Sequence, residues 1–441
     1  MSLANGPRPR GQGPFYGWKL LAALLFIEFA NFAFPLYGSS VINAYMAAGL
    51  HFDRRTLGLA FAVFHWLHGV PAPLVALCVN RRGARFTLVT GGLLVAGGAL
   101  LMSAFARTST HVVLAYGIII GLGTAAGGTL PAQSVASRWF VRKKARAIAS
   151  LFVGLGVGGV IAPPLLNHVI AAAGGNWRAG WLIICGLSLL AALLAFCCVR
   201  EKPSDLGQVP DGELKDPSKI VPARLSAHRA GVYKTTEEWT FSEVWRSPVL
   251  WLMLIGSLGY STGYPAFLAH GVVHLRDLGH TPAEAAYSLS IMVFAGLLGT
   301  LFVAAVGDQV DPKLIWSVAL LVFGGGLVLA VHAKGAAGLY LYATLMGIGI
   351  GGLIPCMMTV PANYFGHKAY PSIIGVILAV GTTVGSLGSY AAGYAYDRFG
   401  SYAPVFYFAA ALCLSGSILL ACLKPPVRVA TKNRAAAATH G

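Results

Sequence analysis

The chain has 441 residues, of which 56% are hydrophobic and only 11% are charged, and its formal net charge is +17. A soluble domain normally carries about 25% charged residues, so this composition excludes an ordinary water-soluble globular protein. The surplus of Lys and Arg is compatible with nucleic-acid binding or with membrane topology, and its distribution along the chain separates the two.

Twelve apolar stretches follow one another, and each is close to the roughly 20 residues that a helix needs to cross a bilayer. Transmembrane barrels show short alternating segments instead of unbroken apolar runs, so helices are the better interpretation. The sequence therefore predicts an all-α membrane protein with twelve transmembrane helices in two six-helix bundles. The predicted spans are Gly17 to Val41, Leu57 to Val79, Phe86 to Phe105, Val112 to Ala136, Ala145 to Ile170, Trp177 to Val199, Val249 to Val273, Ala283 to Val306, Leu314 to Ala333, Ala337 to Val360, Pro371 to Tyr394 and Val405 to Leu423.

A polar segment between the sixth and seventh spans divides the chain into two halves. It begins with EKPSDLGQVPDG, which is typical of a flexible linker, and we expect it to end in a short amphipathic helix near Glu237 to Trp245. No cleavable apolar region precedes the first span, which should therefore remain as an anchor. The expected parts are a tail at 1–16, a bundle at 17–199, the linker at 200–247, a bundle at 248–423 and a tail at 424–441.

The basic residues indicate how the spans are oriented, because cytoplasmic loops retain Lys and Arg. With the N-terminus inside, 25 of the 32 basic residues lie on the cytoplasmic side, so both termini are predicted to be cytoplasmic. These residues are divided among short loops and do not form one face, so we expect the lipid bilayer and no nucleic acid as a partner.

The first span contains an ionisable residue, Glu28, about ten residues from its start. At about 100° per residue, Asn31, Phe32, Pro35 and Ser39 fall on the same face, as a polar cavity would require. Glu28 then either couples transport to protons or contacts a solute. The alternative is a hydrogen-bonded residue that packs helices together.

The second span contributes His65 and His68, with Phe61, Gly69 and Ala72 on the same side. A histidine beside a carboxylate can relay protons or hold an anion. A membrane histidine also serves as a helix-packing group, and the sequence does not decide between these roles.

The second half carries two further polar stripes. In the seventh span, Tyr260, Tyr264, Phe267, Gly271 and His274 share one face, which suits a flat or amphipathic solute, or aromatic packing with His274 at the outer interface. The tenth and eleventh spans add hydroxyl and amide groups that either bind a solute or join helices, namely Thr359, Asn363, Thr383, Ser386 and Tyr390.

The seven cysteines lack metal-ligand spacing and lie in or at the ends of apolar spans, so we expect packing residues, no metal and no cofactor. The sequence also lacks a nucleotide-binding loop, a catalytic carboxylate pair and a soluble domain long enough to signal. It therefore favours a transporter over an enzyme, and a membrane sensor or receptor is the alternative from another class.

The loops after the second span of each half have related sequences, ALCVNRRGAR at 76–85 and AAVGDQVDPK at 304–313. Both resemble the G-x-x-x-D-[RK]-x-G-[RK]-[RK] signature of the major facilitator superfamily, although Asn80 stands where the family has Asp. A basic turn that serves topology alone is the other interpretation. The resemblance implies a cytoplasmic gate formed by Asn80, Arg81, Arg85, Asp308 and Lys313.

Further motifs are similar to those of bacterial members of the monocarboxylate and oxalate:formate porter group. They are FYGWK at 15–19, RWFVRKKARAIAS at 138–150 and a Pro, Leu, Gly, Pro, Asp, Gly pattern at 203–212. The resemblance covers about residues 15 to 425 and implies a rocker-switch carrier with a central site near the bilayer midplane. It also implies a bacterial inner membrane, and we expect a monomer.

One position departs from the group's pattern. Carboxylate-transporting relatives carry an Arg eight residues before the loop Asp, and this position is Thr300 here. Loss of a guanidinium removes the bidentate partner best suited to a carboxylate. The sequence therefore predicts secondary active transport of a small organic solute, with a proton-coupled organic anion ahead of a neutral or weakly charged aromatic compound such as a flavin or xenobiotic.

Overall fold

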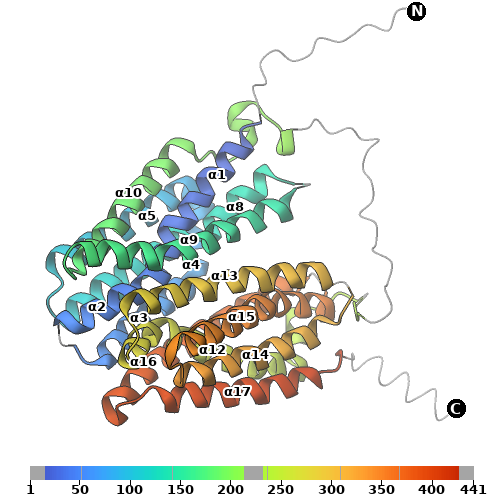
Figure 1. Ribbon diagram of the computed structural model, residues 1–441. Helices are drawn as coiled ribbons and strands as arrows, with labels where there is room; N and C mark the ends of the chain where they lie inside the picture. Colours follow the sequence, from blue (N-terminus) through green and yellow to red (C-terminus); the bar gives the residue numbers. More distant parts are fainter. Residues whose placement is uncertain are drawn as a thin grey trace, which may run out of the picture. The chain divides into compact units, whose positions relative to one another are not determined.

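A computed structural model describes residues 15–50, 52–141, 143–212, 232–235, 237–307, 309–366 and 368–426. Within these ranges all regular structure is helical, as Figure 1 shows. The helices group into two compact units, Met1–His51 with Leu67–Arg224 and Phe52–Trp66 with Leu225–Gly441. Each unit is described separately below.

The first unit contains most of the helices of the first half of the chain. α10 packs against α5, and α9 packs against the chain around η1. Its elements are α1 (Gly17–Glu28), η1 (Phe29–Gly38), α2 (Ser39–Leu50), α4 (Ala72–Arg82), α5 (Ala84–Phe105), α6 (Ser109–Val112), η2 (Val113–Ile120), α7 (Gly121–Gly127), α8 (Thr129–Trp139), α9 (Lys144–Ala172), α10 (Arg178–Cys198), η3 (Pro203–Leu206) and η4 (Pro210–Gly212).

The second unit contains the helices that follow the linker. α15 packs against α13 and α14, and α12 packs against α16 and α17. Its elements are α11 (Phe241–Trp245), α12 (Pro248–Asp277), α13 (Pro282–Val306), α14 (Pro312–Val331), α15 (Gly335–Phe365), α16 (Tyr370–Phe399) and α17 (Ala403–Ala421). α3 (Arg54–Gly69) crosses the boundary, because the chain passes from the second unit to the first between Trp66 and Leu67.

Every predicted span falls on a helix or on a run of consecutive helical segments in the described part of the chain. Ten helices are long and apolar enough to cross a membrane, and α3 with α4, bent by 46°, makes an eleventh. The seventh predicted span lies on α12, which is 30 residues long and rich in Gly, Ser, Tyr and His. The prediction of an all-α membrane protein is therefore confirmed.

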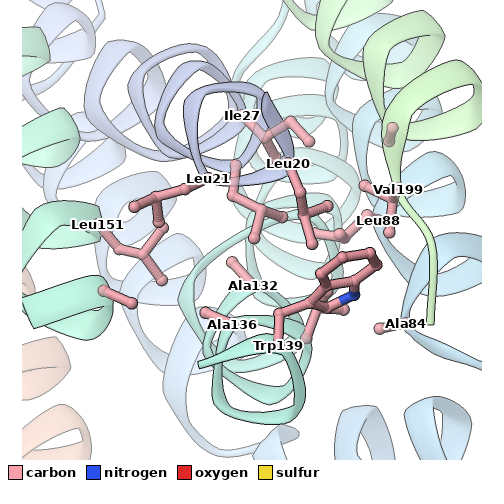
Figure 2. Close-up of a cluster of buried hydrophobic side chains, with 14 of the residues drawn as sticks. Leu20, Leu21, Ile27, Ala84, Leu88, Ala132, Ala136, Trp139, Leu151 and Val199 are labelled. Atoms are coloured by element: carbon pink, nitrogen blue, oxygen red, sulfur yellow. The ribbon is translucent and has the colours of Figure 1, made fainter. Parts of the chain in front are cut away.

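A cluster of buried apolar side chains holds α1 against α5, α8, α9 and α10 at one end of the first unit. Leu20, Leu24 and Ile27 of α1 and Trp139 of α8 are fully buried in it, and Figure 2 shows several of these side chains around the Trp139 ring. The indole N–H of Trp139 donates to the carbonyl oxygen of Arg200 at 2.9 Å, which satisfies its polar atom. This packing fixes the position of α1, whose last residue, Glu28, belongs to the candidate site described below.

The first predicted span is not a regular α-helix throughout. From Phe29 to Gly38 the chain forms wider π-helical turns that contain Pro35. Proline cannot donate the backbone hydrogen bond of a regular helix interior, and π turns occur mostly at functional positions. The 100° spacing used to place Phe32, Pro35 and Ser39 on the face of Glu28 therefore does not hold beyond Glu28.

The linker helix is shorter than predicted. It begins at Phe241 instead of near Glu237, because the carboxylate of Glu243 accepts hydrogen bonds from the backbone N–H and the hydroxyl of Thr240. Residues 237–240 are not helical, and the N–H of Trp239 bonds to the carbonyl oxygen of Phe365.

Candidate functional site

The candidate site of the first unit begins at a break in the fourth predicted span. α7 ends at Gly127 and α8 begins at Thr129, with Gly128 between them in a conformation outside the helical region. A broken helix leaves backbone carbonyl and N–H groups without their usual partners. In membrane transporters, such discontinuous helices are used to build binding sites.

Glu28, the last residue of α1, contacts the second side of this break. Its side chain is 1% exposed, and the hydroxyl of Thr129 donates to one carboxyl oxygen, Oε2, at 3.0 Å. No basic group forms an ion pair with Glu28 in the part of the chain that the structure describes. A carboxyl group in this environment is costly to keep for packing alone, which makes it a functional candidate.

Asn31 contacts the first side of the same break. Its Nδ2 group donates to the carbonyl oxygen of Gly127 at 3.4 Å. Two glycines make room for it, because a Cβ on Gly127 or Gly92 would lie 3.0 Å or 3.2 Å from Nδ2. Gly91 lies so close to the backbone of Gly127 that a Cβ there would overlap it. Glu28 and Asn31 therefore hold opposite sides of the break between α7 and α8.

Several polar atoms in this region have no hydrogen-bond partner among the described residues. They are Oε1 of Glu28, Oδ1 of Asn31 and Oγ of Ser188 on α10, and all three side chains are almost completely buried. Buried polar atoms of folded proteins are nearly always paired, so unmatched atoms need an explanation. A proton, a water molecule or a solute at this position would supply one.

The two histidines of α3 contact different neighbours. His68, in the first unit, stacks on Phe32 with ring centroids 4.4 Å apart. His65, in the second unit, lies against α16, where a Cβ on Gly385 would be 3.2 Å from its Cδ2 atom. His68 and Phe32 thus extend the first unit's polar region with an aromatic surface.

In the second unit, the predicted tyrosine pair forms as expected on α12. Tyr260 and Tyr264 stack with centroids 5.4 Å apart, and Tyr260 also meets Phe323 edge-on. His274, near the end of α12, is buried, and its Nε2 group bonds to the carbonyl oxygen of Ala330 at 3.1 Å. This part of the predicted stripe joins α12 to α14.

The predicted hydroxyls of the tenth and eleventh spans are directed at their own helices. Thr383 donates to the carbonyl oxygen of Ala379 at 2.8 Å and Ser386 to that of Thr382 at 2.7 Å, while Thr359 donates to Pro355 at 2.8 Å. A hydroxyl group that donates its hydrogen to the preceding turn of its own helix does not donate it to a solute. Tyr390 is 37% exposed on α16.

Thr300, where the family resemblance leads us to expect an Arg, links two helices. Its hydroxyl lies within hydrogen-bond distance of the carbonyl oxygens of Gly296, at 3.0 Å, and of Gly351 on α15, at 3.2 Å. Gly351 approaches Gly296 so closely that a Cβ there would overlap its carbonyl oxygen. A short side chain fits this crossing of α13 and α15.

The residues of the predicted cytoplasmic gate have varied surroundings. Asn80 and Arg81 are exposed at the end of α4, and the guanidinium of Arg85 lies 4.6 Å from the Phe196 ring centroid. Lys313 donates through Nζ to the carbonyl oxygen of Leu423 at 2.8 Å, at the end of α17. Asp308 lies outside the described residues.

The sequence analysis did not single out Glu201, which joins the loop around Gly83 to α8. Its carboxylate accepts hydrogen bonds from the N–H of Arg85 and from the Nη1 group of Arg138, both at 2.8 Å. Thr129 was also missed, although the Gly-Gly pair before it is a helix-breaking signal inside an apolar span.

Comparisons with known proteins agree with this architecture. The sequence profile of the Major Facilitator Superfamily matches residues 21–296 and 271–440. Monocarboxylate transporter 13 of Bos taurus is 30% identical over 355 residues, covering 79% of this chain and 76% of the relative. Monocarboxylate transporter 2 of Homo sapiens is 24% identical over 413 residues, covering 92% of this chain and 84% of the relative.

Solved structures match in fold. A point mutant of the nucleoside transporter NupG has a TM-score of 0.69 at 15% identity, covering 92% of this chain and 99% of that one. A POT family transporter in complex with a thioalcohol-conjugated peptide has a TM-score of 0.71 at 16% identity, covering 92% and 97%.

The helical spans, the break between α7 and α8 and the buried carboxyl group of Glu28 beside it are typical of a polytopic membrane transporter. The chain belongs to the major facilitator superfamily. The resemblance seen in the sequence motifs is thereby confirmed, as is the prediction of a transporter in preference to an enzyme.

Proposed function

We propose that this chain is a proton-coupled transporter of monocarboxylate-like organic anions that works by alternating access. The observation that carries the proposal is its relation to monocarboxylate transporters, which extends over 79% to 92% of the chain in the two relatives described above. The buried carboxyl group of Glu28 supplies a group for the coupling ion.

The proton step is assigned to Glu28. One carboxyl oxygen accepts from Thr129 at 3.0 Å, and the other has no partner among the described residues and is available to bind a proton. Asp and Glu residues inside spans mark proton relays in many transporters. Asn31, with its unmatched Oδ1 atom, would hydrogen-bond the solute or a water molecule next to Glu28.

Recognition of the anion cannot use a buried guanidinium or ammonium group in the described spans. Each Lys and Arg on these helices lies within three residues of a helix end. His68 is a basic side chain of the first unit, and it stacks on the ring of Phe32, the residue that follows Asn31. We therefore assign contact with the carboxylate to His68, and an auxiliary role to His65.

The membrane arrangement is part of the same proposal. Lys and Arg gather on the side of both termini, which supports cytoplasmic termini. The motifs similar to those of bacterial porters favour a bacterial inner membrane. The two six-helix bundles would span 17–199 and 248–423, and the carrier would act as a monomer. Arg81, Arg85, Asn80, Asp308 and Lys313 would form the cytoplasmic gate.

A second candidate solute is a neutral or weakly charged aromatic compound. Two points favour it. Thr300 stands where the family resemblance leads us to expect an Arg, and the stacked Tyr260 and Tyr264 rings offer a flat aromatic surface. An aromatic solute stacks on such rings without needing a cation.

Thermal stabilisation of the purified protein separates the two candidates, because a ligand that binds only the folded state raises Tm. The panel contains lactate and pyruvate, dicarboxylates, aromatic acids, flavins and neutral aromatic compounds. Stabilisation by monocarboxylates that increases at lower pH supports the proposed function. Stabilisation by flavins or neutral aromatics alone would replace it with the second candidate.

A further inference from the structure

α14 and α17 lie side by side in the second unit (Figure 1), and a groove of about 300 Å³ runs between them. Two glycines of α14 make room for it. A Cβ on Gly324 would lie 2.9 Å from Cys413 of α17, whereas one on Gly325 would meet no atom within 4 Å. Gly325 therefore faces open space in the groove, which is also lined by Leu321, Val328, Tyr407, Ala410 and Leu414.

The α14–α17 groove has the width of a single hydrocarbon chain. On α14 it extends from Leu321 to Val328, which at 1.5 Å per residue is about 10 Å, or about two thirds of one leaflet of a roughly 30 Å hydrocarbon core. Its mean cross-section is then about 30 Å², enough for a chain one methylene wide, since carbon atoms pack at about 4 Å. An α-helix is about 10 Å across and does not fit inside.

The groove opens on an apolar surface. Leu321 and Leu414, on its two helices, are 43% and 54% exposed. Both helices are long and apolar enough to cross a membrane, so their exposed apolar side chains contact lipid tails. Apolar contact alone does not select one lipid, because lipid tails are as apolar as Leu. Selectivity has to come from polar groups at an end of the groove.

Polar and basic groups lie at the end of the groove where α14 terminates. The Tyr407 hydroxyl is hydrogen-bonded to Nε2 of His332, the residue after α14, at 2.5 Å. This pair keeps one donor in either tautomer of the neutral ring, namely the Tyr407 O–H if Nε2 carries the hydrogen and the His332 Nδ1–H if it does not. Lys334 follows two residues later, is exposed, and forms no ion pair within the described part of the chain.

The acidic residues of this half do not neutralise Lys334. Asp397 is the one acidic residue in the sequence from 312 to 441, and its carboxylate accepts backbone N–H groups at the start of α3. The carboxylate of Glu284 caps α13 and lies 3.9 Å from Nδ1 of His280. The positive charge of Lys334 is therefore available to an anionic ligand.

We propose that the α14–α17 groove binds an anionic phospholipid of the bilayer. One acyl chain lies in the groove over Gly325, and the phosphate group lies beside Lys334 and the pair of His332 and Tyr407. A phosphate oxygen accepts the free donor of this pair, and Lys334 supplies the opposite charge. The inference does not depend on the proposed solute or on Glu28.

Native mass spectrometry of the full-length purified protein in detergent tests the proposal. Phosphatidylglycerol and phosphatidylcholine with the same acyl chains are added separately, and the lipid-bound fractions give an apparent Kd for each. Tighter binding of phosphatidylglycerol is expected, because it carries a net negative charge and phosphatidylcholine does not. Equal binding of the two lipids would overturn the proposal.

Lys334→Gln tests the site of the phosphate group. We expect it to weaken phosphatidylglycerol binding by about fivefold, the effect of one basic residue near an anionic lipid, and to leave phosphatidylcholine binding unchanged. Arg107→Gln is the matched control, because Arg107 is an exposed basic residue in a loop of the first unit. An unchanged preference for phosphatidylglycerol in Lys334→Gln would contradict the proposal.

Gly325→Leu tests the site of the acyl chain. The new side chain enters open space, so the fold should tolerate it, and phosphatidylglycerol should bind about tenfold more weakly because two groups cannot occupy the same space. Gly375→Leu on α16 is the matched control, since a Cβ there also meets no atom within 4 Å. The Tm without added lipid verifies folding, and if Gly325→Leu lowered it, Lys334→Gln would decide the outcome.

The proposal requires both site variants to lose binding while both controls keep it. Unchanged binding by a folded Gly325→Leu variant, or an equal loss in the controls, would overturn it. A dimer that Gly325→Leu abolishes while phosphatidylglycerol still binds would also overturn it, and would assign the groove to a second copy of the chain. Since neither solute nor proton gradient is present, failure of the proposed function leaves this result unaffected.

Discussion

The polar residues around Glu28 and the hydroxyl groups of Thr383 and Ser386 on α16 differ in how completely their hydrogen bonds are satisfied. In the first unit, Glu28 and Asn31 each keep an oxygen without a partner beside a broken helix. In the second unit, Thr383 and Ser386 bond to their own helix. Polar residues therefore occur in the spans of both halves, but Glu28 and Asn31 keep buried oxygens that can still accept a hydrogen bond, whereas the hydroxyl groups of Thr383 and Ser386 donate to their own helix.

The strongest test of this difference is Glu28→Gln. We expect proton-driven uptake of lactate into liposomes to fall to the level of empty liposomes, because the amide cannot carry the proton, while counterflow without a pH gradient continues. Glu284→Gln is the matched control, since the Glu284 side chain caps α13 and is 42% exposed. Normal pH-driven uptake by Glu28→Gln would remove Glu28 from the mechanism.

Gly91→Ala tests the packing that positions Asn31. The added methyl group would collide with the backbone of Gly127, and overpacking of this kind costs about 1–3 kcal/mol. A lower Tm of the purified variant is therefore expected. Gly97→Ala on the same helix has no atom within 4 Å of the new Cβ, so its Tm should not decrease. Similar Tm values for both variants would contradict the close packing of α5 and α7.

Thr129→Val removes the hydroxyl that donates to Glu28 and keeps the shape of the side chain. Loss of one hydrogen bond of about 1 kcal/mol should lower the rate of proton-driven uptake by about fivefold. This decrease is measured by comparing the initial uptake rates of Thr129→Val and the wild type at equal protein content. A rate equal to that of the wild type would mean that Thr129 does not position Glu28.

Thr383→Val makes the same chemical change in the second unit, and we expect the smallest effect. The Thr383 hydroxyl bonds to the carbonyl oxygen of Ala379 in its own helix, so uptake should change by less than about twofold. If Thr383→Val reduced the apparent affinity for lactate more than Thr129→Val does, the solute site would have to include α16.

The spans could be predicted from the sequence because hydrophobic length is a local property. Glu28 was found for a similar reason, since an ionisable residue stands out in an apolar run. Thr129 was not found, because its contact with Glu28 joins residues 101 positions apart and depends on the break at Gly128. The π-helical turns after Glu28 also changed which residues share its face.

In the second unit, the sequence identified the polar and aromatic residues but not their hydrogen-bond partners. Its aromatic and hydroxyl stripes were visible, but whether each group bonds to a solute, another helix or its own backbone depends on tertiary structure. Asp397 is one example, because its carboxylate accepts the backbone N–H of Arg54, a residue 343 positions earlier in the chain.

The most direct test of proton-coupled monocarboxylate transport is simultaneous recording of lactate uptake and external pH in liposomes containing the purified protein. The account predicts that lactate uptake is accompanied by alkalinisation of the medium, and that Glu28→Gln loses both while Glu284→Gln keeps both. Lactate uptake without proton movement, or the absence of protein-dependent lactate uptake, would contradict it.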